Sequence, residues 1–527
     1  MTESSKAAET SGAVSRGVAA EPKRVAVVGA GPAGIYASDI LAKSDLDVSI
    51  DLFERLPAPY GLVRYGVAPD HPRIKQIIVA LYKILQRGDI RLFGNVEVGH
   101  DITVQELQDR YDAVIFATGA DRDAALDIPG VDLPQSYGAA DFVSWYDGHP
   151  DYPRQWPLEA KEVAIFGAGN VALDVARVLG RHTSEMISTE IPANVAEVLE
   201  ANPVTDIHVF GRRGPAQVKF TPLELRELGR VADVDVIVSE QDFDFDKGSD
   251  KAMRASNQQR QVVKILTSYA SQDPEDLKAS RRIYLHMFEA PNEIVADEHG
   301  NVSAVVTERT ELVGDGTVRG TGELTTWPAQ AVYRAVGYYS SPIDGVPFDT
   351  EKGVIPNVEG RVVESPGSEE TLPGVYATGW IKRGPVGLIG STKSDAQETI
   401  AHLVQDAQEG RLAASVDQPI ESLLEERQVP FTTWQGWEML DAYERALGEG
   451  YGPTESGEDR ERIKVVSRTA MTDISRGALP AEAVESQAVD DAAGRDLIGK
   501  PGELGKPHAR ERFADFTGPT DYETAED

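Results

Sequence analysis

One stretch near the start of the chain constrains its fold more than any other. The β-branched run Arg24–Val28 leads into the turn Gly29-Ala-Gly31-Pro-Ala33-Gly34, and a helical pattern follows. Gly29 permits the tight turn, Gly31 lets the backbone approach a pyrophosphate, and Gly34 lets the helix pack against the strand. The phosphates then face the unpaired N–H groups at the start of the helix. This order of strand, glycine turn and helix predicts a dinucleotide site.

An acidic residue supports the same interpretation. The strand-like segment Val48–Phe53 ends at Glu54, about 20 residues after Gly34, where an acid can bind ribose hydroxyls. A glycine turn alone is a weak signal, because ordinary turns also use glycine. With the strand, the helix and the acid all in place, a nucleotide site explains the stretch better than an ordinary turn does.

A second unit of the same kind follows later in the chain. The segment Glu162–Phe166 leads into the turn Gly167-Ala-Gly-Asn-Val-Ala172, and a helical pattern continues to Arg177. Ala172 stands at the third glycine position, which the fingerprint permits. One such unit could arise by chance, whereas two well-separated units in one chain indicate a pair of nucleotide sites.

An arginine pair indicates which nucleotide the second unit binds. The strand Ile207–Phe210 is followed by Arg212 and Arg213, at a place where an acid suits the 2′-hydroxyl of NAD and an arginine suits a 2′-phosphate. The spacing from Ala172 exceeds the usual interval because 183–203 reads as an inserted helical excursion. An arginine pair in a surface turn is otherwise solvated charge, so both interpretations stay open at this point.

Charge and cysteine content exclude several classes of function. The formal net charge is −34 and there are no cysteines. The acidic surface repels nucleic acid and anionic lipid, so local positive charge must hold any anionic ligand. The missing cysteines exclude disulfides, thiolate metal sites and cysteine-ligated iron–sulphur clusters in this chain. No apolar run reaches the roughly 18 residues that span a bilayer.

The rest of the chain reads as alternating strands and helices. The proline- and glycine-rich loop Pro57–Arg73 carries Tyr60, Arg64 and His71, and a loop on a rigid scaffold can aim such side chains at a ligand. The strands at 294–312 and 330–336 are expected to return the chain to the first domain. Further expected elements are helices at 74–86 and 393–410, strands at 96–98, 111–117 and 373–377, and disordered segments at 1–22 and 480–527.

One segment is locally basic within this acidic chain. It spans Lys251–Arg282, and most such clusters are merely exposed faces. Against the acidic background we interpret it as a candidate docking surface for an acidic partner. Its basic residues of interest are Arg254, Arg260, Lys264, Lys278, Arg281 and Arg282.

Six long motifs occur in a characteristic order. They are Gly29–Gly34, Tyr60–Pro72, Gly169–Arg177, Gly211–Pro215, Leu223–Glu227 and Gly379–Gly390. Together they closely resemble the motifs of adrenodoxin reductase-type ferredoxin-NADP reductases, particularly the actinobacterial ones, from about Lys23 to about Val466. The resemblance implies an α/β fold of two Rossmann-like dinucleotide-binding domains. The NADP domain, 121–335, would be inserted into an FAD domain made of 23–120 and 336–470.

The resemblance also implies roles for particular residues. His71 and Glu227 match a family pair close to the flavin and the nicotinamide, although a fold-stabilising hydrogen bond between them is the alternative. Arg122 lies near, but not at, the position of a further family arginine. The implied FAD contacts, together with those from the glycine turn, are Gly29, Gly31, Ala33, Gly34, Glu54, Leu62, Val98, Trp380, Gly387, Leu388 and Ile389. The corresponding NADP contacts are Gly167, Gly169, Asn170, Val171, Ala172, Arg212, Arg213, Glu224 and Gly387.

The expected function is transfer of hydride from NADPH to FAD and of single electrons to a ferredoxin. Pyridine nucleotide-disulfide reductases need a redox cysteine pair, and the reductase subunit of a glutamate-synthase-like complex typically brings cysteine-ligated clusters; this chain lacks both. A general NADPH diaphorase and a nucleotide-sensing flavoprotein without electron transfer stay open. We expect no metal site and no nucleic-acid or membrane partner. A cytoplasmic monomer or weak dimer is expected.

Overall fold

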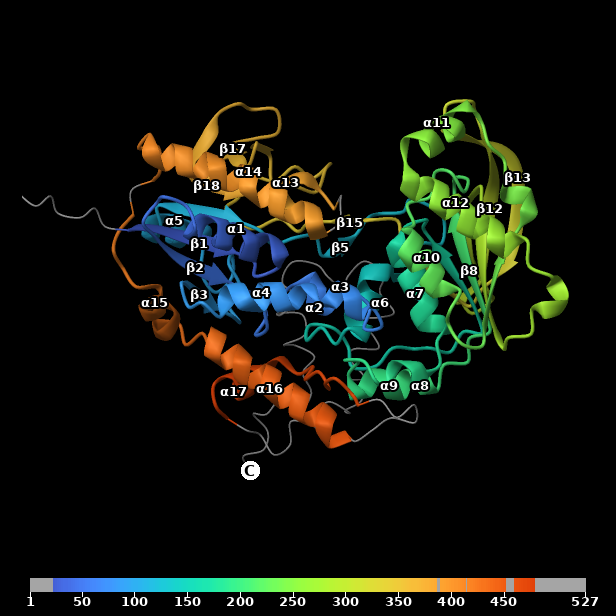
Figure 1. The fold of residues 1–527 in the computed structure, drawn as a ribbon, viewed down its shortest axis with the longest axis horizontal. Helices are drawn as coiled ribbons and strands as arrows, with labels where there is room; N and C mark the ends of the chain where they lie inside the picture. The colour runs from blue at the N-terminus through green and yellow to red at the C-terminus, as the bar shows by residue number, and fades with distance from the viewer. Residues whose placement is uncertain (1–21, 386–388, 414, 452–458, 479–527) are drawn as a thin grey trace, which may run out of the picture.

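The structure is a computed structural model that describes residues 22–385, 389–413, 415–451 and 459–478. Its first main sheet has seven strands in the order β16-β17-β18-β4-β1-β2-β3 (Figure 1). The strands from β18 to β3 run parallel, whereas β17 and β16 are antiparallel additions at one edge. The strands are β1 (Lys23–Val28), β2 (Val48–Phe53), β3 (Ile90–Phe93), β4 (Ala113–Phe116), β16 (Asn357–Val358), β17 (Arg361–Val363) and β18 (Thr371–Ala377).

The second main sheet is wholly parallel, with six strands in the order β6-β14-β7-β8-β10-β9. A three-stranded antiparallel sheet, β11-β12-β13, packs against it. The second sheet consists of β6 (Ser136–Gly138), β7 (Glu162–Phe166), β8 (Asp206–Gly211), β9 (Val234–Val238), β10 (Arg281–Met287) and β14 (Ala331–Arg334). The small sheet consists of β11 (Glu289–Ala296), β12 (Val302–Leu312) and β13 (Val318–Pro328).

The chain passes between the two main sheets at one place. The strands β5 (Arg122–Asp123) and β15 (Tyr338–Tyr339) pair antiparallel as a two-stranded ribbon. The second sheet therefore lies between two halves of the first in sequence, which is the predicted fold class. We call the part around the first sheet the first domain and the part around the other two the second domain. The boundary residues given above stay a prediction.

Continuous apolar strands explain the parallel sheets. The last four residues of β1, Val25–Val28, are all buried, as expected for a strand covered on both faces. The helices α1 (Pro32–Ala42), α4 (Ile77–Leu85) and α14 (Ile389–Gln408) contribute to the core on one side of this sheet. A separate core fills the second domain around α7 (Asn170–Gly180).

The remaining helices are mostly short. Within the described residues no helix has the length and hydropathy needed to cross a bilayer. They are α2 (Leu62–Tyr65), α3 (Pro72–Lys75), α5 (Val104–Arg110), α6 (Ala139–Tyr146), α8 (Thr183–Met186), α9 (Ala193–Glu200), α10 (Pro222–Leu228), α11 (Lys247–Ala255), α12 (Asn257–Ala270), α13 (Trp380–Arg383), α15 (Ile420–Glu426), α16 (Trp434–Tyr451) and α17 (Arg468–Ser475), with 3-10 turns at Glu240–Asp242 and Pro274–Asp276.

Three predicted strand segments are wrong or misplaced. The segment 96–98 is not a strand: Gly94 pairs instead with Thr432 from the far end of the chain, and Asn95 turns away with φ +58°. Neither segment expected to return the chain to the first domain does so. The segment 294–312 falls on β11 and β12 of the three-stranded sheet, and β14 lies between β6 and β7 in the second sheet. The return is made by β15.

Three smaller differences complete the comparison with the sequence. The predicted helix 74–86 is divided into α3 and α4 around Gln76, while the loop before it contains the single turn α2. The helix α17 lies where the sequence analysis expects no helix. The expected disorder at 480–527, and at 1–22 apart from Pro22, falls outside the described residues.

Candidate active site

The first glycine turn is possible only with glycine at two of its positions. Gly29 has φ +105°, and a Cβ on it would lie 2.6 Å from the carbonyl oxygen of Ala117 at the end of β4. A Cβ on Gly34 would lie 1.9 Å from the carbonyl oxygen of Gly29. Both contacts are with backbone, which cannot move aside. The turn therefore holds β1 and α1 close together, as the fingerprint predicts.

The helices that follow the two glycine turns have no side chain to cap them. Gly31 precedes α1 and Gly169 precedes α7, and neither helix has a side-chain cap or an acid in its first turn. By contrast, α5 has a complete capping box from Thr103 and Glu106. Free N–H groups and the helix dipole favour an anion at such an end. The two uncapped helices follow the two glycine turns, so the structure fits a phosphate group at each.

Segments far apart in sequence meet at the first turn. A Cβ on Gly61 would lie 3.2 Å from the Cα of Gly31, and one on Gly379 would lie 2.6 Å from the Cβ of Ala33. The loop before Leu62 and the start of α13 at Trp380 therefore border the turn. Backbone from three segments thus approaches closely at this turn, as the binding of an elongated dinucleotide such as FAD requires.

Glu54 lies at the end of β2, beside the same turn. Its carboxylate accepts hydrogen bonds from the backbone N–H groups of Ala30, at 2.9 Å, and Leu56, at 3.0 Å. Burial raises the pKa of Glu54, and these two hydrogen bonds oppose that rise. Val98, by contrast, packs at the edge of the core cluster that includes Phe93. Glu54 and Val98, both predicted to contact FAD, thus lie in a hydrogen-bonded and an apolar environment, respectively.

The second glycine turn resembles the first and is more open. A Cβ on Gly167 would lie 2.3 Å from the carbonyl oxygen of Ala335, whereas one on Gly169 would meet nothing within 4 Å. Asn170 accepts a hydrogen bond from the backbone N–H of Thr221 at 2.8 Å, which ties the turn to the start of α10. Val171 and Ala172 continue into the first turn of α7.

The arginine pair follows β8 directly. Arg212 is exposed and Arg213 is half-buried. Their backbone carbonyls accept hydrogen bonds from Thr310 Oγ1 and the Phe288 N–H, which fix the loop. Neither guanidinium forms an ion pair with another described residue. Two unpaired arginines on a fixed loop near a glycine turn suit a phosphate monoester.

His71 lies at the centre of a cluster that joins the two domains. Its loop belongs to the first domain, while α7 and α10 of the second domain supply three carboxylates. Glu224 lies 2.6 Å and Asp174 lies 2.9 Å from Nε2, and Glu227 lies 2.8 Å from Nδ1. Arg177 completes the cluster through ion pairs with Asp174, at 2.7 Å, and with Asp70, at 2.6 Å.

Carboxylates determine the charge of His71. Burial and Arg177 lower its pKa, but hydrogen bonds to Asp174 and Glu224 outweigh both and raise the pKa to about 10. The ring is therefore a cation at neutral pH. The oxygen and nitrogen atoms of His71, Glu224 and Glu227 lie within 4.8 Å of one another, but the positive charge of Arg177 beside them opposes a metal ion. The described cluster can instead order polar groups and present fixed charge.

The structure gathers most of the predicted site residues into two groups joined by His71. Sequence reasoning missed Asp70, Asp174 and Arg177, although the i, i+3 spacing of the last two placed them on one helix face. Gly387 and Leu388 lie outside the described residues, and Ile389 is described only as the start of α14. Arg122 donates to the carbonyl oxygen of Ser340 in the ribbon between domains.

The predicted basic surface needs correction. Arg281 is buried and donates to carbonyl oxygens, among them that of Arg181 at 2.7 Å. Arg282 is neutralised by an ion pair with Asp206 at 2.7 Å. Both lie on β10, a central strand of the second sheet, and are not available for docking. Of the other predicted residues, Arg254, Arg260 and Lys264 are exposed on α11 and α12, and Lys278 is exposed in the segment before β10. Lys247 of α11 adds a further exposed cation.

Comparison with known proteins agrees with this geometry. Residues 23–205 match the model of the pyridine nucleotide-disulphide oxidoreductase family. The NADPH-ferredoxin reductase FprA of Mycobacterium tuberculosis is 40% identical over 473 residues, covering 86% of this chain and all of that protein. The chain belongs to the NADPH-ferredoxin (adrenodoxin) reductase family.

Other members of the family agree over similar lengths. The mitochondrial NADPH:adrenodoxin oxidoreductase of Arabidopsis thaliana is 38% identical and covers 81% of this chain and 91% of that protein. A solved structure of M. tuberculosis FprA in complex with NADPH superposes with a TM-score of 0.78 at 39% identity, covering 86% of this chain and 100% of that one. The likeness to disulphide oxidoreductases extends to the fold but not to their thiol chemistry, since this chain has no cysteine.

Proposed function

We propose that this protein is a ferredoxin-NADP(+) reductase: an FAD flavoprotein that oxidises NADPH and reduces a ferredoxin-type iron–sulphur protein. Bound FAD supplies the chemistry that links a two-electron hydride donor to a one-electron acceptor. The observation that carries the proposal is the pair of uncapped helices behind two glycine turns, one with an unpaired arginine pair beside it. The protein's own part is to bind both nucleotides, orient them and tune their surroundings.

We assign FAD to the first turn. The α1 N–H groups would face its pyrophosphate, and Glu54, already fixed by Ala30 and Leu56, would accept from ribose hydroxyls. The close approach of Gly61 and Gly379 brings Leu62 and Trp380 to the same turn. The proposed FAD contacts are Gly29, Gly31, Ala33, Gly34, Glu54, Leu62, Val98, Trp380, Gly387, Leu388 and Ile389.

We assign NADP(H) to the second turn. Gly169 leaves open space at the start of α7, where the pyrophosphate would approach the backbone. Arg212 and Arg213 would bind the 2′-phosphate, which NADH lacks. The proposed NADP contacts are Gly167, Gly169, Asn170, Val171, Ala172, Arg212, Arg213, Glu224 and Gly387.

We propose that His71 and Glu227 orient the nicotinamide and supply fixed charge near the reacting rings. Neither residue needs to exchange a proton in a hydride transfer, so placement and electrostatics are the roles left to them. The short contact of Glu227 with the cationic ring of His71, at 2.8 Å, supports a shared role. The alternative, a purely structural bond, predicts that loss of Glu227 changes stability and not the rate.

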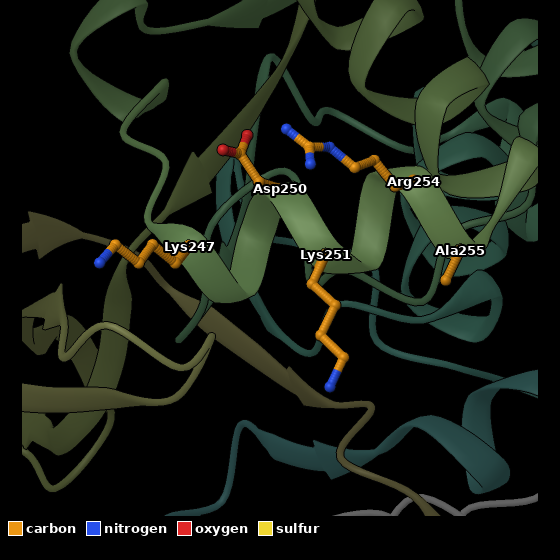
Figure 2. Close-up of a pocket in the computed structure, with 5 residues that line it drawn as sticks. All are labelled: Lys247, Asp250, Lys251, Arg254 and Ala255. Carbon is orange, nitrogen blue, oxygen red and sulfur yellow. The ribbon is translucent and has the colours of Figure 1, made fainter.

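We propose that ferredoxin docks on α11 and α12. Lys247, Lys251 and Arg254 extend from α11 in different directions, with Arg254 beside Asp250 (Figure 2). Together with Asp250 and Ala255 they line an open hollow of about 570 Å³. These three cations and Lys264 of α12 are exposed and form no ion pair with another described residue. Charges beyond roughly 8 to 10 Å are largely screened at physiological salt. Nearby cations can therefore attract an acidic partner despite the net charge of −34.

One titration tests the proposal. Purified protein should be yellow, release FAD on denaturation, lose its flavin absorbance on addition of NADPH and regain it with an oxidised ferredoxin. Bleaching without recovery by ferredoxin would favour a general diaphorase or a nucleotide sensor. Colourless protein that cannot be reconstituted with FAD would exclude a flavoprotein. We further propose a cytoplasmic location and a monomer or weak dimer.

A further inference from the structure

A buried strap from the C-terminal region lies against both domains. The strap, defined as Arg460–Val465, packs beside α16, which runs beneath the first domain toward α8 and α9 (Figure 1). On the second domain, Arg460 donates to the carbonyl oxygen of Ile191 at 2.5 Å, and the Glu461 N–H donates to that of Ser188 at 3.3 Å. The strap thus extends the first domain's chain onto the second domain.

Lys464 is the residue of the strap that contacts both domains at once. Its Nζ donates to the carbonyl oxygen of Arg64 in α2, at 2.7 Å, and to that of Asp147 at the end of α6, at 3.0 Å. The third contact is an ion pair with Glu190, between α8 and α9, at 2.7 Å. An ammonium has three N–H donors, and here each has an acceptor on a different segment. The side chain is 0% exposed.

A buried ionic network surrounds Lys464. Glu190 also accepts from Lys75 at 2.5 Å, and Glu444 of α16 pairs with Arg64 at 2.5 Å. Burial lowers the pKa of Lys464 to about 8 despite Glu190. An ammonium buried without partners costs much free energy. The groups that accept from Lys464 therefore have to keep their positions. The network contains four buried cations, Arg64, Lys75, Arg462 and Lys464, and four carboxylates, Asp147, Glu190, Asp441 and Glu444, and the more exposed Arg445 also pairs with Asp441.

A glycine inside α16 lets the strap come this close. Gly448 lies in the last part of the helix, where glycine lowers helix stability. A Cβ at this position would lie 2.7 Å from the carbonyl oxygen of Arg460 and 2.7 Å from the Cα of Arg462. Both contacts are with backbone, so the strap would have to shift. Gly448→Ala therefore displaces the strap without altering any charge.

The covalent link between the domains is slight, and the strap adds a tie to those made by the His71 cluster and by the ion pair of Lys75 with Glu190. The ribbon of β5 and β15 pairs two residues with two. The loop held by Lys464 through Arg64 also carries Leu62 and His71, whereas Asp147 and Glu190 belong to the second domain. We infer that Lys464 is a positioning residue that sets the second domain against the first, and thereby the nicotinamide against the flavin. This inference rests on the proposed function.

Flavin reduction kinetics test the inference. Displacement of reacting groups by about 1 Å can lower a rate up to a hundredfold, so Lys464→Met should slow reduction of bound FAD at saturating NADPH by about tenfold. The NADPH concentration for half-saturation should stay within about twofold, because the 2′-phosphate site lies wholly in the second domain. The matched control is Glu461→Gln, an exposed residue of the same strap, which should behave as wild type.

Two further variants separate positioning from stability. Lys464→Met with Glu190→Gln restores the charge balance but not the hydrogen bonds to Arg64 and Asp147, so reduction should stay slow. Gly448→Ala should be slow as well, and it carries the test if Lys464→Met does not fold. Wild-type rates in folded Lys464→Met, or recovery in the double variant, would overturn the inference. Wild-type protein that NADPH does not reduce would instead overturn the proposed function.

A distance measurement tests the tie independently of activity. The chain has no cysteine, so Gln105→Cys on α5 and Gln258→Cys on α12, both exposed, can carry a unique pair of spin labels. The interdomain distance distribution should be a single narrow peak in the otherwise wild-type protein. Lys464→Met should broaden or shift it, and Glu461→Gln should not. An unchanged distribution in Lys464→Met would overturn the inference.

Discussion

At the scale of single residues, unpaired charge and paired charge carry different consequences. Arg212 and Arg213 have no acidic partner among the described residues, so their charge is available to a ligand. His71 has three carboxylates around it, so its charge is used inside the protein. The first case predicts an effect on nucleotide choice, and the second predicts effects on rate and on stability.

Replacing either Arg212 or Arg213 with alanine should lower kcat/KM for NADPH by roughly tenfold to a hundredfold. A charge-assisted bond to phosphate is worth about 1.5 to 3 kcal/mol, and this loss appears in the transition-state free energy. The value for NADH should change little. Arg319→Ala on β13, an exposed arginine that pairs with Glu311, is the control. Equal losses with both nucleotides would show that the pair is structural.

Glu227→Gln should change the rate of flavin reduction while FAD stays bound. The substitution removes a negative charge from beside His71 but keeps the size of the side chain. Rapid-mixing absorbance with NADPH gives the rate, and the absorbance ratio of flavin to protein gives the FAD content. Loss of FAD or of the fold, with no change of rate in the remaining holoprotein, would support the purely structural role.

His71 also makes stability depend on pH. Its pKa rises from 6.5 to about 10 on folding, so its contribution is complete below pH 6.5 and is lost as the pH rises through 10. Each pKa unit corresponds to about 1.4 kcal/mol. The difference in unfolding free energy between wild type and His71→Gln, from urea titrations, should therefore shrink from pH 6.5 to 10. A difference independent of pH would show that the folded ring is not a cation.

At the scale of elements, the two glycine turns allow a matched comparison. Gly34→Ala places a Cβ 1.9 Å from the carbonyl oxygen of Gly29, whereas Gly169→Ala meets nothing within 4 Å. Gly34→Ala should separate α1 from β1 and abolish FAD binding. Gly169→Ala should leave folding and FAD unchanged but weaken NADPH binding about tenfold or more, because the methyl group occupies the phosphate approach. Calorimetric titration and flavin content measure both.

Local pattern predicted most elements, and long-range pairing explains the errors. The strand, turn and helix units around Gly29 and Gly167 follow from glycine spacing and apolar runs within about 30 residues. The prediction of a strand at 96–98 was wrong because Gly94 pairs with Thr432, a partner that no local pattern reveals. β14 was misplaced for a similar reason: a buried strand fits any parallel sheet, and only tertiary pairing with β6 and β7 decides which.

The site was predictable where one element carries it and not where several meet. Thr followed by Pro is a local signal for the start of a helix, and Thr221 before Pro222 begins α10, where its side chain accepts from the Glu224 N–H. The His71 cluster draws on a loop and two helices, so its carboxylate set could not be read from spacing. Arg281 was wrongly predicted to be exposed. The composition of its segment is that of a surface, but the alternation along β10 buries this side chain.

At the scale of the whole molecule, charge is distributed unevenly. Lys251→Glu with Lys264→Glu should raise the KM for ferredoxin and weaken its salt dependence, because the exposed cations of α11 and α12 are then partly reversed. NADPH reduction of ferricyanide, which needs no docking, should not change. Lys352→Glu, an exposed lysine of the first domain, is the control. Unchanged ferredoxin reduction at all salt concentrations would place the partner elsewhere.

The ribbon between the domains also determines where the second domain could be removed from the chain or exchanged. The Asp121 N–H donates to the carbonyl oxygen of Tyr339 at 3.1 Å, and that of Ala124 donates to Gly337 at 2.8 Å, so the second domain leaves and rejoins the chain at one point. A unit with adjoining ends can be excised or exchanged as a cassette without stretching the remainder. A second domain taken from another protein would need counterparts of Asp147 and Glu190, because Lys464 lies outside the exchanged segment and would still require these partners.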